Sequence, residues 1–477
     1  MCDCCELTDD DKEFVEQVLN LLDQKHDLEE AVAAGDVGGQ EAETRWQEML
    51  RAVERTGMSD LLEAADVDAE RIWIGDDEYY RVDSLSGEKS YLGSAGEVPA
   101  NRTVYRKAGE HNAPLVCPLE LRWGMVDGKW TPKCARSIGY LGQQMPYSQA
   151  AETAEELGEL PYSASSFERM TTRLGGMCDD QSTAIDKAVL EDLTVPDEAA
   201  SIVVSVDRVS VAIDEADPVA WRDGRKADGD IHFRMAWCAT ICLCDGHGEP
   251  LWARRLGEMP KEEAAETLGD KLSRQVRALR QRDETLQIVC LSDGAPELGD
   301  LLDTYIIEPE WSGDAVRLVD AFHLYGYLGE AARAHYDDPD EARLQMGAWR
   351  LELMNTPEAI ETIELQIQMW EDRDKVVDGD QPIESALTYI ANHNDQMNYA
   401  PHRARGRPVG TGHVEATCKS LVQLRMKRNG QRWKHEGGQA VMKLRSLALS
   451  DGWEAGVTRL LETYRTDDAI YARKRVA

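Results

Sequence analysis

The stretch SIVVSVD (Ser201–Asp207) is an apolar run that ends on an aspartate. A second run of the same kind, LQIVCLSD (Leu286–Asp293), ends on an aspartate 86 residues later (293 − 207 = 86). Short apolar runs rich in β-branched residues and followed by turn residues are typical of buried strands. The sequence therefore predicts two buried strands that each end on a carboxylate.

The segment from residue 198 to residue 325 alternates between strand and helix patterns. VSVAI is predicted as a second short strand piece, HFRMAWCATICLC as a long strand and EPLWARRLG as a further one. Pro260 is predicted to open a helix, because apolar residues recur behind it at helical spacing: Ala265, Leu268, Leu272, Val276 and Leu279. A helix with Pro296 in its first turn and the strand VRLVDAFH follow LQIVCLSD. The order of three strands, helix, strand, helix and strand predicts a ribonuclease H-like α/β domain.

Three regions of different composition precede this domain. Residues 1–70 are acidic and predicted to be helical, and residues 71–140 hold short β-rich runs that predict a small β domain. Within residues 141–195, two predicted helices meet at Gly158, an arrangement that suits a DNA-binding helix-turn-helix. An ordinary helical hairpin is the alternative interpretation of this region.

The α/β domain is predicted to be interrupted by an all-α insertion, residues 326–402, after which residues 403–477 complete it with a basic helix and a C-terminal tail. Amphipathic stripes in the insertion predict a small helical bundle. Three prolines are expected to start its helical segments: Pro339, Pro357 and Pro382. We assign Trp349 and Trp370 to the bundle core rather than to stacking on DNA bases.

Asp207 and Asp293 are the first candidates for chemistry, because a carboxylate at the end of a buried strand needs a compensating charge. Two such acids on neighbouring strands predict a divalent cation, and hard Mg²⁺ prefers oxygen ligands. The alternative is that each aspartate caps the turn or helix that follows it. The strand order favours the metal site.

Glu415 is the third candidate, at the start of a predicted helix behind the glycine-rich stretch PVGTG. It is one of two acids in residues 401–450, which hold eleven basic residues and a net charge of +9 (11 − 2). An acid among so many bases predicts a metal ligand, whereas a surface ion pair with Lys419 is the alternative. The basic side chains predict contacts with DNA phosphates, and the candidates are Lys419, Arg425, Lys427, Arg428, Arg432 and Lys434.

Asp320 and His323 form a D-x-x-H pattern in VDAFHLYGYL. His323 is a candidate for a phosphate contact or for proton transfer near the metal ions. A structural pair, with the histidine bonded to Asp320 at a helix start, is the alternative.

Composition excludes several classes of protein. The formal charge is 53 − 89 = −36, but 24 of the acids and only 6 of the bases lie in residues 1–80, so a local basic surface remains possible. Eleven cysteines without regular spacing argue against a disulfide framework, favour a reducing cytoplasm and predict no zinc site. No apolar run reaches the ~18–20 residues that a membrane helix needs, and the acidic start does not suit a secretory signal.

The chain resembles bacterial insertion-sequence transposases of the ISKra type. The resemblance is carried by Asp207 in SVDRVSV, Asp293 in CLSDGAPEL and Glu415 in GTGHVEATCKSLVQLRMKRNGQRW, and upstream by CPLELRWGMVDGKWTPKCA and LPYSASSFERM. It covers residues from about 100 to about 460, and GTG..E..CK...RMKR.G.RW is its most specific part. The long spacing before the last acid, 415 − 293 = 122 residues, matches the subset of transposases with a helical insertion there. The D-x-x-H pattern is similar to a motif of Mutator-like enzymes.

This resemblance implies a transposase that cuts at the ends of an insertion sequence and joins them to target DNA. It implies two Mg²⁺ ions, replaceable by Mn²⁺, held by Asp207, Asp293 and Glu415. The implied partners are double-stranded DNA, as element ends and target, and at least one further copy of the chain; the implied location is a prokaryotic cytoplasm, at the nucleoid. Two alternatives stay open: a ribonuclease H-like nuclease or resolvase without strand transfer, and a domesticated DNA-binding protein without catalysis.

Overall fold

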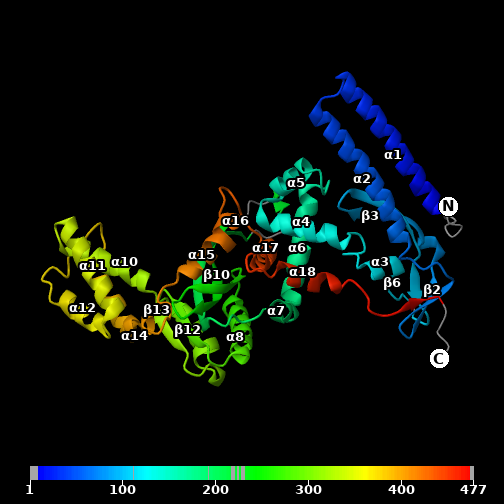
Figure 1. The fold of residues 1–477 in the computed structure, drawn as a ribbon. Helices are drawn as coiled ribbons and strands as arrows, with labels where there is room; N and C mark the ends of the chain where they lie inside the picture. The colour runs from blue at the N-terminus through cyan, green and yellow to red at the C-terminus, as the bar shows by residue number, and fades with distance from the viewer. Residues whose placement is uncertain are drawn as a thin grey trace. The chain divides into compact units, whose positions relative to one another are not determined.

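The computed structural model describes residues 9–110, 112–191, 193–215, 221–222, 225–226 and 231–472 (Figure 1). The chain divides into two compact units: unit 1 holds Met1–Met177 and Gly456–Ala477, and unit 2 holds Cys178–Ala455. Both units combine helices with strands, so the predicted mixed α/β class is confirmed. Within the described part of the chain, no helix has the length and apolar character needed to span a membrane.

Unit 1 begins with two long helices, α1 (Asp9–Ala34) and α2 (Gly39–Glu63), which pack side by side (Figure 1). Leu62, near the end of α2, is fully buried against Tyr91 and Val98 of the following β region. That region holds the strands β1 (Arg71–Ile74), β2 (Asp77–Arg81), β3 (Gly87–Gly93), β4 (Gly96–Arg102), β5 (Tyr105–Lys107) and β6 (Leu115–Val116). The β-rich character predicted for residues 71–140 is present from Arg71 to Val116, whereas the rest of that range is largely helical, in α3 (Pro118–Trp123) and α4 (Pro132–Gln144).

The C-terminal end of the chain returns to unit 1 as strand β14 (Ile470–Tyr471), which pairs with β1. Trp73 stacks on Tyr471 with ring centroids 6.3 Å apart, and the Arg122 guanidinium donates a 2.7 Å hydrogen bond to the carbonyl of Ile470. The sequence placed this tail with the α/β domain. The structure places the tail in unit 1 instead, because the strand and the ring that it contacts lie about 400 residues (471 − 73 = 398) earlier in the chain.

The two helices predicted around Gly158 are α5 (Tyr147–Glu156) and α6 (Ala164–Asp180). Gly158 has a φ of +70°, a backbone conformation that favours glycine at such a turn. The border between the units falls inside α6, and α7 (Ser182–Glu191) belongs to unit 2. The predicted helix-turn-helix region therefore contributes to both units.

Unit 2 is built on a five-stranded sheet with the order β11-β10-β7-β12-β13. The central strand β7 (Ala199–Asp214) pairs antiparallel with β10 (Ile231–Asp245) and parallel with β12 (Gln287–Ser292). The outer strands are β11 (Pro250–Glu258) and β13 (Val316–Val319). The predicted series of three strands, helix, strand, helix and strand is present, with α8 (Ala264–Arg282) and α9 (Pro296–Leu302) as the helices.

Two local predictions in this sheet need correction. SIVVSVD and VSVAI form one strand rather than two, because β10 pairs with β7 along its whole length, from Ala199 to Asp214. Asp207 therefore lies within a strand and does not end one. The helix expected from Pro260 begins at Ala264.

The face of the sheet that α8 covers carries one of the apolar cores of unit 2. Four residues of the predicted stripe, Leu268, Leu272, Val276 and Leu279, are fully buried in one cluster with apolar residues of β7, whereas Ala265 is only partly buried at its border. At the end of β11, the buried Glu258 bonds to Lys271 of α8 and to Lys443 of α17 (His435–Ala448). Burial raises the pKa of Glu258, but the two ammonium groups outweigh it and bring the pKa to about 2. This ionised centre ties both helices to the sheet.

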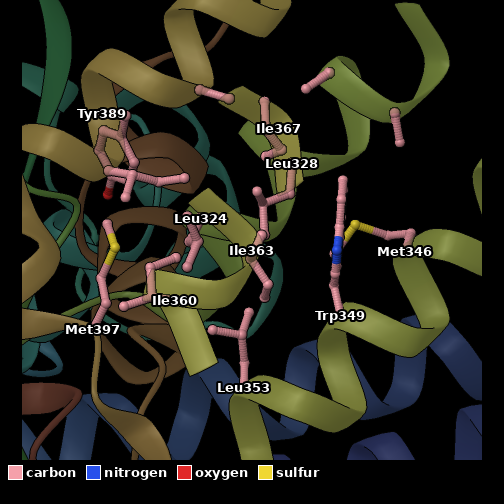
Figure 2. Close-up of a cluster of buried hydrophobic side chains, with 14 of the residues drawn as sticks. Leu324, Leu328, Met346, Trp349, Leu353, Ile360, Ile363, Ile367, Tyr389 and Met397 are labelled. Atoms are coloured by element: carbon pink, nitrogen blue, oxygen red, sulfur yellow. The ribbon is translucent and has the colours of Figure 1, made fainter. Parts of the chain in front are cut away.

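The predicted insertion is a helical bundle between β13 and residue 404 (Figure 1). Its helices are α10 (Ala321–His335), α11 (Pro339–Asn355), α12 (Ala359–Gln368), α13 (Pro382–His393) and α14 (Tyr399–Arg403). Pro339 and Pro382 start helices as predicted, whereas α12 starts two residues after Pro357. Figure 2 shows the bundle core, in which Trp349 lies beside Met346 and across from leucine and isoleucine side chains. Trp349 and Trp370 are both buried, as predicted.

The first prediction concerns this core. Trp349 is fully buried, and its indole N–H donates a 2.9 Å hydrogen bond to Oε1 of Gln366. We expect Trp349→Ala to lower the free energy of unfolding by about 3–5 kcal/mol, because it opens a cavity and leaves Gln366 without its donor. Leu344→Ala, on the same helix but 75% exposed, should change it by less than about 0.5 kcal/mol. Urea denaturation followed by tryptophan fluorescence and circular dichroism measures both, and equal losses would contradict the assignment.

Candidate active site

The pairing register of two strands brings Asp207 and Asp293 to the same level of the sheet. The last parallel pair between β12 and β7 is Leu291 with Ser205, and each aspartate lies two residues further along its strand direction. Oδ1 of Asp293 accepts a 2.8 Å hydrogen bond from the backbone N–H of Ala295, which holds it at the turn into α9. The two carboxylates predicted from the sequence are therefore neighbours.

The environment of Asp207 disfavours its charge. Burial raises the pKa of this carboxyl, and the negative charge of Asp293 raises it further. The backbone N–H of Arg208, the thiol of Cys418 and the side chain of His323 act in the opposite direction, without cancelling the rise. Among the described residues, neither aspartate has an ion pair with a lysine or arginine. Among the described residues, His323 is the side chain whose positive charge lowers the pKa of Asp207, and it does not offset the rise.

Glu415 lies on α15 (Gly412–Thr417), which packs against β10 and β7. The hydroxyls of Thr417 and Thr240 are 2.7 Å apart, and Sγ of Cys418 donates to Oδ2 of Asp207 at 3.3 Å. These contacts fix the start of the π-helical segment η5 (Cys418–Gln423) beside Asp207. π-helical turns inside helices are frequent at functional sites.

Asp207 and Glu415 line one groove of about 630 Å³, which we call the acidic groove. Lys419 and Lys427 also line it, as does Ser210 of β7. Glu415 and Lys419 are exposed, so both side chains are available to a ligand in the groove. The groove thus combines acids that suit a cation with lysines that suit phosphate.

Asp320 and His323 lie at the start of α10, but the side chain of Asp320 is buried and that of His323 is exposed. Asp320 is buried and caps α10 by accepting a 2.9 Å hydrogen bond from the backbone N–H of Phe322. Its other carboxylate oxygen accepts a hydrogen bond from the hydroxyl of Thr411. The sequence placed Asp320 on a strand; it is the cap residue instead, because β13 ends at Val319.

His323 is exposed and faces two tyrosine rings, with centroids 5.4 Å away at Tyr327 and 5.7 Å away at Tyr389. Its charge also lowers the pKa of Asp207, which places it near the acidic pair. Tyr389, on α13, donates a 2.7 Å hydrogen bond to the backbone carbonyl of Asp293. Burial, followed by the charge of Asp293, raises the Tyr389 pKa, so the phenol stays a donor at neutral pH.

Sequence reasoning missed Tyr389, Thr411 and Cys418. Tyr389 looks like an apolar position of a bundle helix, and nothing in its local pattern indicates that it reaches Asp293. Thr411 and Cys418 lie within the quoted motif around Glu415, so that motif was the only available signal for them. Each contact joins segments at least 91 residues apart (411 − 320 = 91).

The helix predicted after the glycine-rich stretch is present from Gly412 to Met426, but the most basic part of the segment, which follows it, is a loop. The helical structure ends with α16 (Leu424–Met426), and α17 begins only at His435. The exposed basic side chains of this loop are Lys427, Arg428, Arg432 and Lys434. The loop is tied to the free edge of β7 at Trp433, whose backbone N–H donates to the carbonyl of Ala212 and whose carbonyl accepts from the N–H of Asp214.

Arg425 departs from the expectation of a phosphate contact. It is only 1% exposed, and its guanidinium lies 4.9 Å from the ring centroid of Trp433. A buried guanidinium stacked on an indole ring holds the loop to the core. Its side chain does not present a surface to DNA in this structure.

The residues at the site fit a divalent cation in charge and in donor atoms. Asp207 and Asp293 offer oxygen ligands and lack a positive partner, and Glu415 faces the same groove as Asp207. Within the described residues, however, no group of three His, Cys, Asp or Glu side chains is already arranged to hold a metal ion. The eight described cysteines are buried and free, while Cys2, Cys4 and Cys5 lie outside the described residues.

Comparison with known proteins assigns the chain to no family: no family model matches it, and no curated protein has a matching sequence.

The second prediction follows from the charge of Asp207. The pKa of Asp207 is raised in the folded chain, so at pH values above this raised pKa the ionised carboxylate lowers the stability of the folded state. Below the ordinary aspartate pKa of about 3.9 the carboxyl is protonated in both states, and this loss of stability disappears. We expect Asp207→Asn to raise the free energy of unfolding at pH 7 by about 0.5–2 kcal/mol, without divalent cations, and to give no gain at about pH 3.

Asp245 provides a control of opposite sign. The backbone N–H groups of Glu249 and His247 lower the pKa of Asp245, so Asp245→Asn should not stabilise the chain at pH 7. Urea denaturation at the two pH values measures both variants. A loss of stability in Asp207→Asn at pH 7 would show that the carboxylate is favourably compensated, against this interpretation.

Proposed function

We propose that unit 2 carries a ribonuclease H-like core and that the chain is a DNA transposase that cuts the ends of an insertion sequence and joins them to target DNA. The observation that carries the proposal is the position of the acids in the sheet. Asp207 lies on the central strand β7, Asp293 follows the adjacent parallel strand β12, and Glu415 lies on a helix packed against the sheet after a helical insertion. The resemblance of the three motifs to ISKra-type transposases supports the same assignment.

Asp207, Asp293 and Glu415 would hold two Mg²⁺ ions, for which Mn²⁺ can substitute. When bound, such ions stabilise the attacking and leaving oxygens of an in-line displacement at phosphorus. The protein's own groups prepare the site: the Cys418 thiol orients Asp207, and the Tyr389 hydroxyl fixes the backbone at Asp293. His323 is exposed beside them and is a candidate for contact with phosphate or for moving a proton.

Double-stranded DNA is the proposed partner. Lys419 and Lys427 line the acidic groove, and Arg428, Arg432 and Lys434 continue the positive charge along the loop. The α5–α6 pair is the candidate for recognition of the element ends. Work on two ends implies at least a dimer in the DNA complex, in a prokaryotic cytoplasm at the nucleoid.

The third prediction tests the aspartate pair. We expect Asp207→Asn and Asp293→Asn each to reduce cleavage below a few per cent of wild type, because the carboxylate charge is lost and the shape is kept. The substrates are labelled oligonucleotides from the DNA flanking the gene, searched for inverted repeats, with Mg²⁺ or Mn²⁺. Binding of the same DNA without divalent cations is the control and should persist.

The outcomes of this assay separate the alternatives. Cleavage without joining of a 3′-hydroxyl end to target DNA would indicate a nuclease or resolvase. Binding without any cleavage by the wild-type chain would indicate a non-catalytic DNA-binding protein. Substantial activity in either aspartate variant would remove that residue from the metal site.

The fourth prediction identifies the third carboxylate. Glu415 lines the acidic groove, whereas both carboxylate oxygens of Asp320 already accept hydrogen bonds, one from the backbone at the start of α10 and one from Thr411. We therefore expect Glu415→Gln to eliminate both cleavage and strand transfer, and Asp320→Asn to reduce them only partially, because asparagine can still cap α10. Lys419→Ala should mainly weaken DNA binding. An active Glu415→Gln protein beside an inactive Asp320→Asn protein would transfer the role to Asp320.

A further inference from the structure

Phe233 is a large apolar side chain on the surface of unit 2. It lies on β10 opposite Ala212 of β7 and is 76% exposed. A groove of about 290 Å³, which we call the Phe233 groove, runs between this strand pair and the loop that follows α16. Burying this ring against a ligand would remove a large apolar surface from water.

The walls of the Phe233 groove combine apolar and positive side chains. Ile231 and Met426 are apolar neighbours of Phe233 in the groove, and Lys427, Arg428 and Arg432 supply the charge. Among the described residues, no acid lines it, although acids outnumber bases by 89 to 53 in the whole chain. An aromatic ring beside a positive track is the combination that binds single-stranded nucleic acid, because bases stack on the ring and phosphates follow the charge.

The Phe233 groove adjoins the acidic groove. Ser210 and Lys427 line both. A DNA strand whose phosphate lies at Asp207 and Glu415 would therefore have Lys427 beside it on the side that leads to the Phe233 groove.

We propose that the Phe233 groove binds unpaired nucleotides of one DNA strand, with a base stacked on Phe233 and the phosphates held by Lys427, Arg428 and Arg432. Inside a duplex each base pair is stacked on both faces, so an unpaired base can cover this ring and an internal base pair cannot. The inference deepens the proposed function: it states that the strand entering the acidic groove is unpaired next to the reacting phosphate.

The fifth prediction compares single-stranded and duplex DNA on the full chain without divalent cations. The probes are a dye-labelled oligothymidylate of about 12 nucleotides and a blunt duplex of equal length, measured by fluorescence anisotropy. We expect Phe233→Ala to weaken binding of the single strand about tenfold and binding of the duplex less than about twofold. Phe233→Tyr keeps the ring and should bind like wild type.

Two controls complete the experiment. Leu344→Ala removes an equally exposed apolar side chain, 75% exposed and outside the groove, and should leave both affinities unchanged. Thermal unfolding followed by circular dichroism shows that Phe233→Ala is folded, as its exposure implies. An oligouridylate of the same length tests the sugar, and tighter binding of that RNA than of the DNA would overturn the proposal.

Failure of this inference can be distinguished from failure of the proposed function. Equal single-strand affinity of Phe233→Ala and wild type would overturn this inference, and cleavage that depends on Asp207 would still support the transposase. Loss of single-strand binding in Phe233→Ala, with no cleavage by the wild-type chain, would support the groove and reject the transposase.

Discussion

The parallel register between β12 and β7 is the constraint on which the candidate site depends. Pairing of Leu291 with Ser205 sets two aspartates at one level of the sheet, close enough for the charge of Asp293 to raise the pKa of Asp207. Like charges at short range are unfavourable unless a cation compensates them. Placing these two carboxylates together costs stability, and this is the cost that the proposed cation would offset.

The helical insertion and the segment that follows it make hydrogen bonds next to this pair of aspartates. At its start, Asp320 caps α10, and its backbone N–H bonds to the carbonyl of Ser292 at 2.8 Å. At its end, the hydroxyl of Thr411 bonds to the Asp320 carboxylate, and the chain enters α15 with Glu415. From its middle, Tyr389 reaches the backbone of Asp293. The insertion therefore helps to shape the acidic groove as well as forming its own core around Trp349 (Figure 2).

The positive charge of residues 401–450 is divided between two uses. Arg425 is buried over Trp433, and Lys443 is buried at Glu258, so both stabilise the core of unit 2. Lys427 and Arg432 remain exposed on a loop that follows the free edge of β7. Because β7 extends beyond β12, this edge is open to Trp433, and the loop is held where the acidic groove and the Phe233 groove meet.

The sequence by itself determined the elements whose signal is local. Apolar runs and helical spacing predicted the strand and helix series of unit 2, the stripe on α8, the bundle with Trp349 and Trp370, and the acids at 207 and 293 as a pair. Tertiary structure decided what depends on contacts between distant segments. Pairing with β10 made β7 continuous through Asp207, and pairing with β1 drew the C-terminal tail into unit 1. Stacking on Trp433 buried Arg425, and the fold of the insertion brought Tyr389 to Asp293. Local patterns report which face of an element is apolar, but a lysine or arginine has the same local pattern on the surface and in the core, and only the partner that arrives from elsewhere in the chain fixes its place.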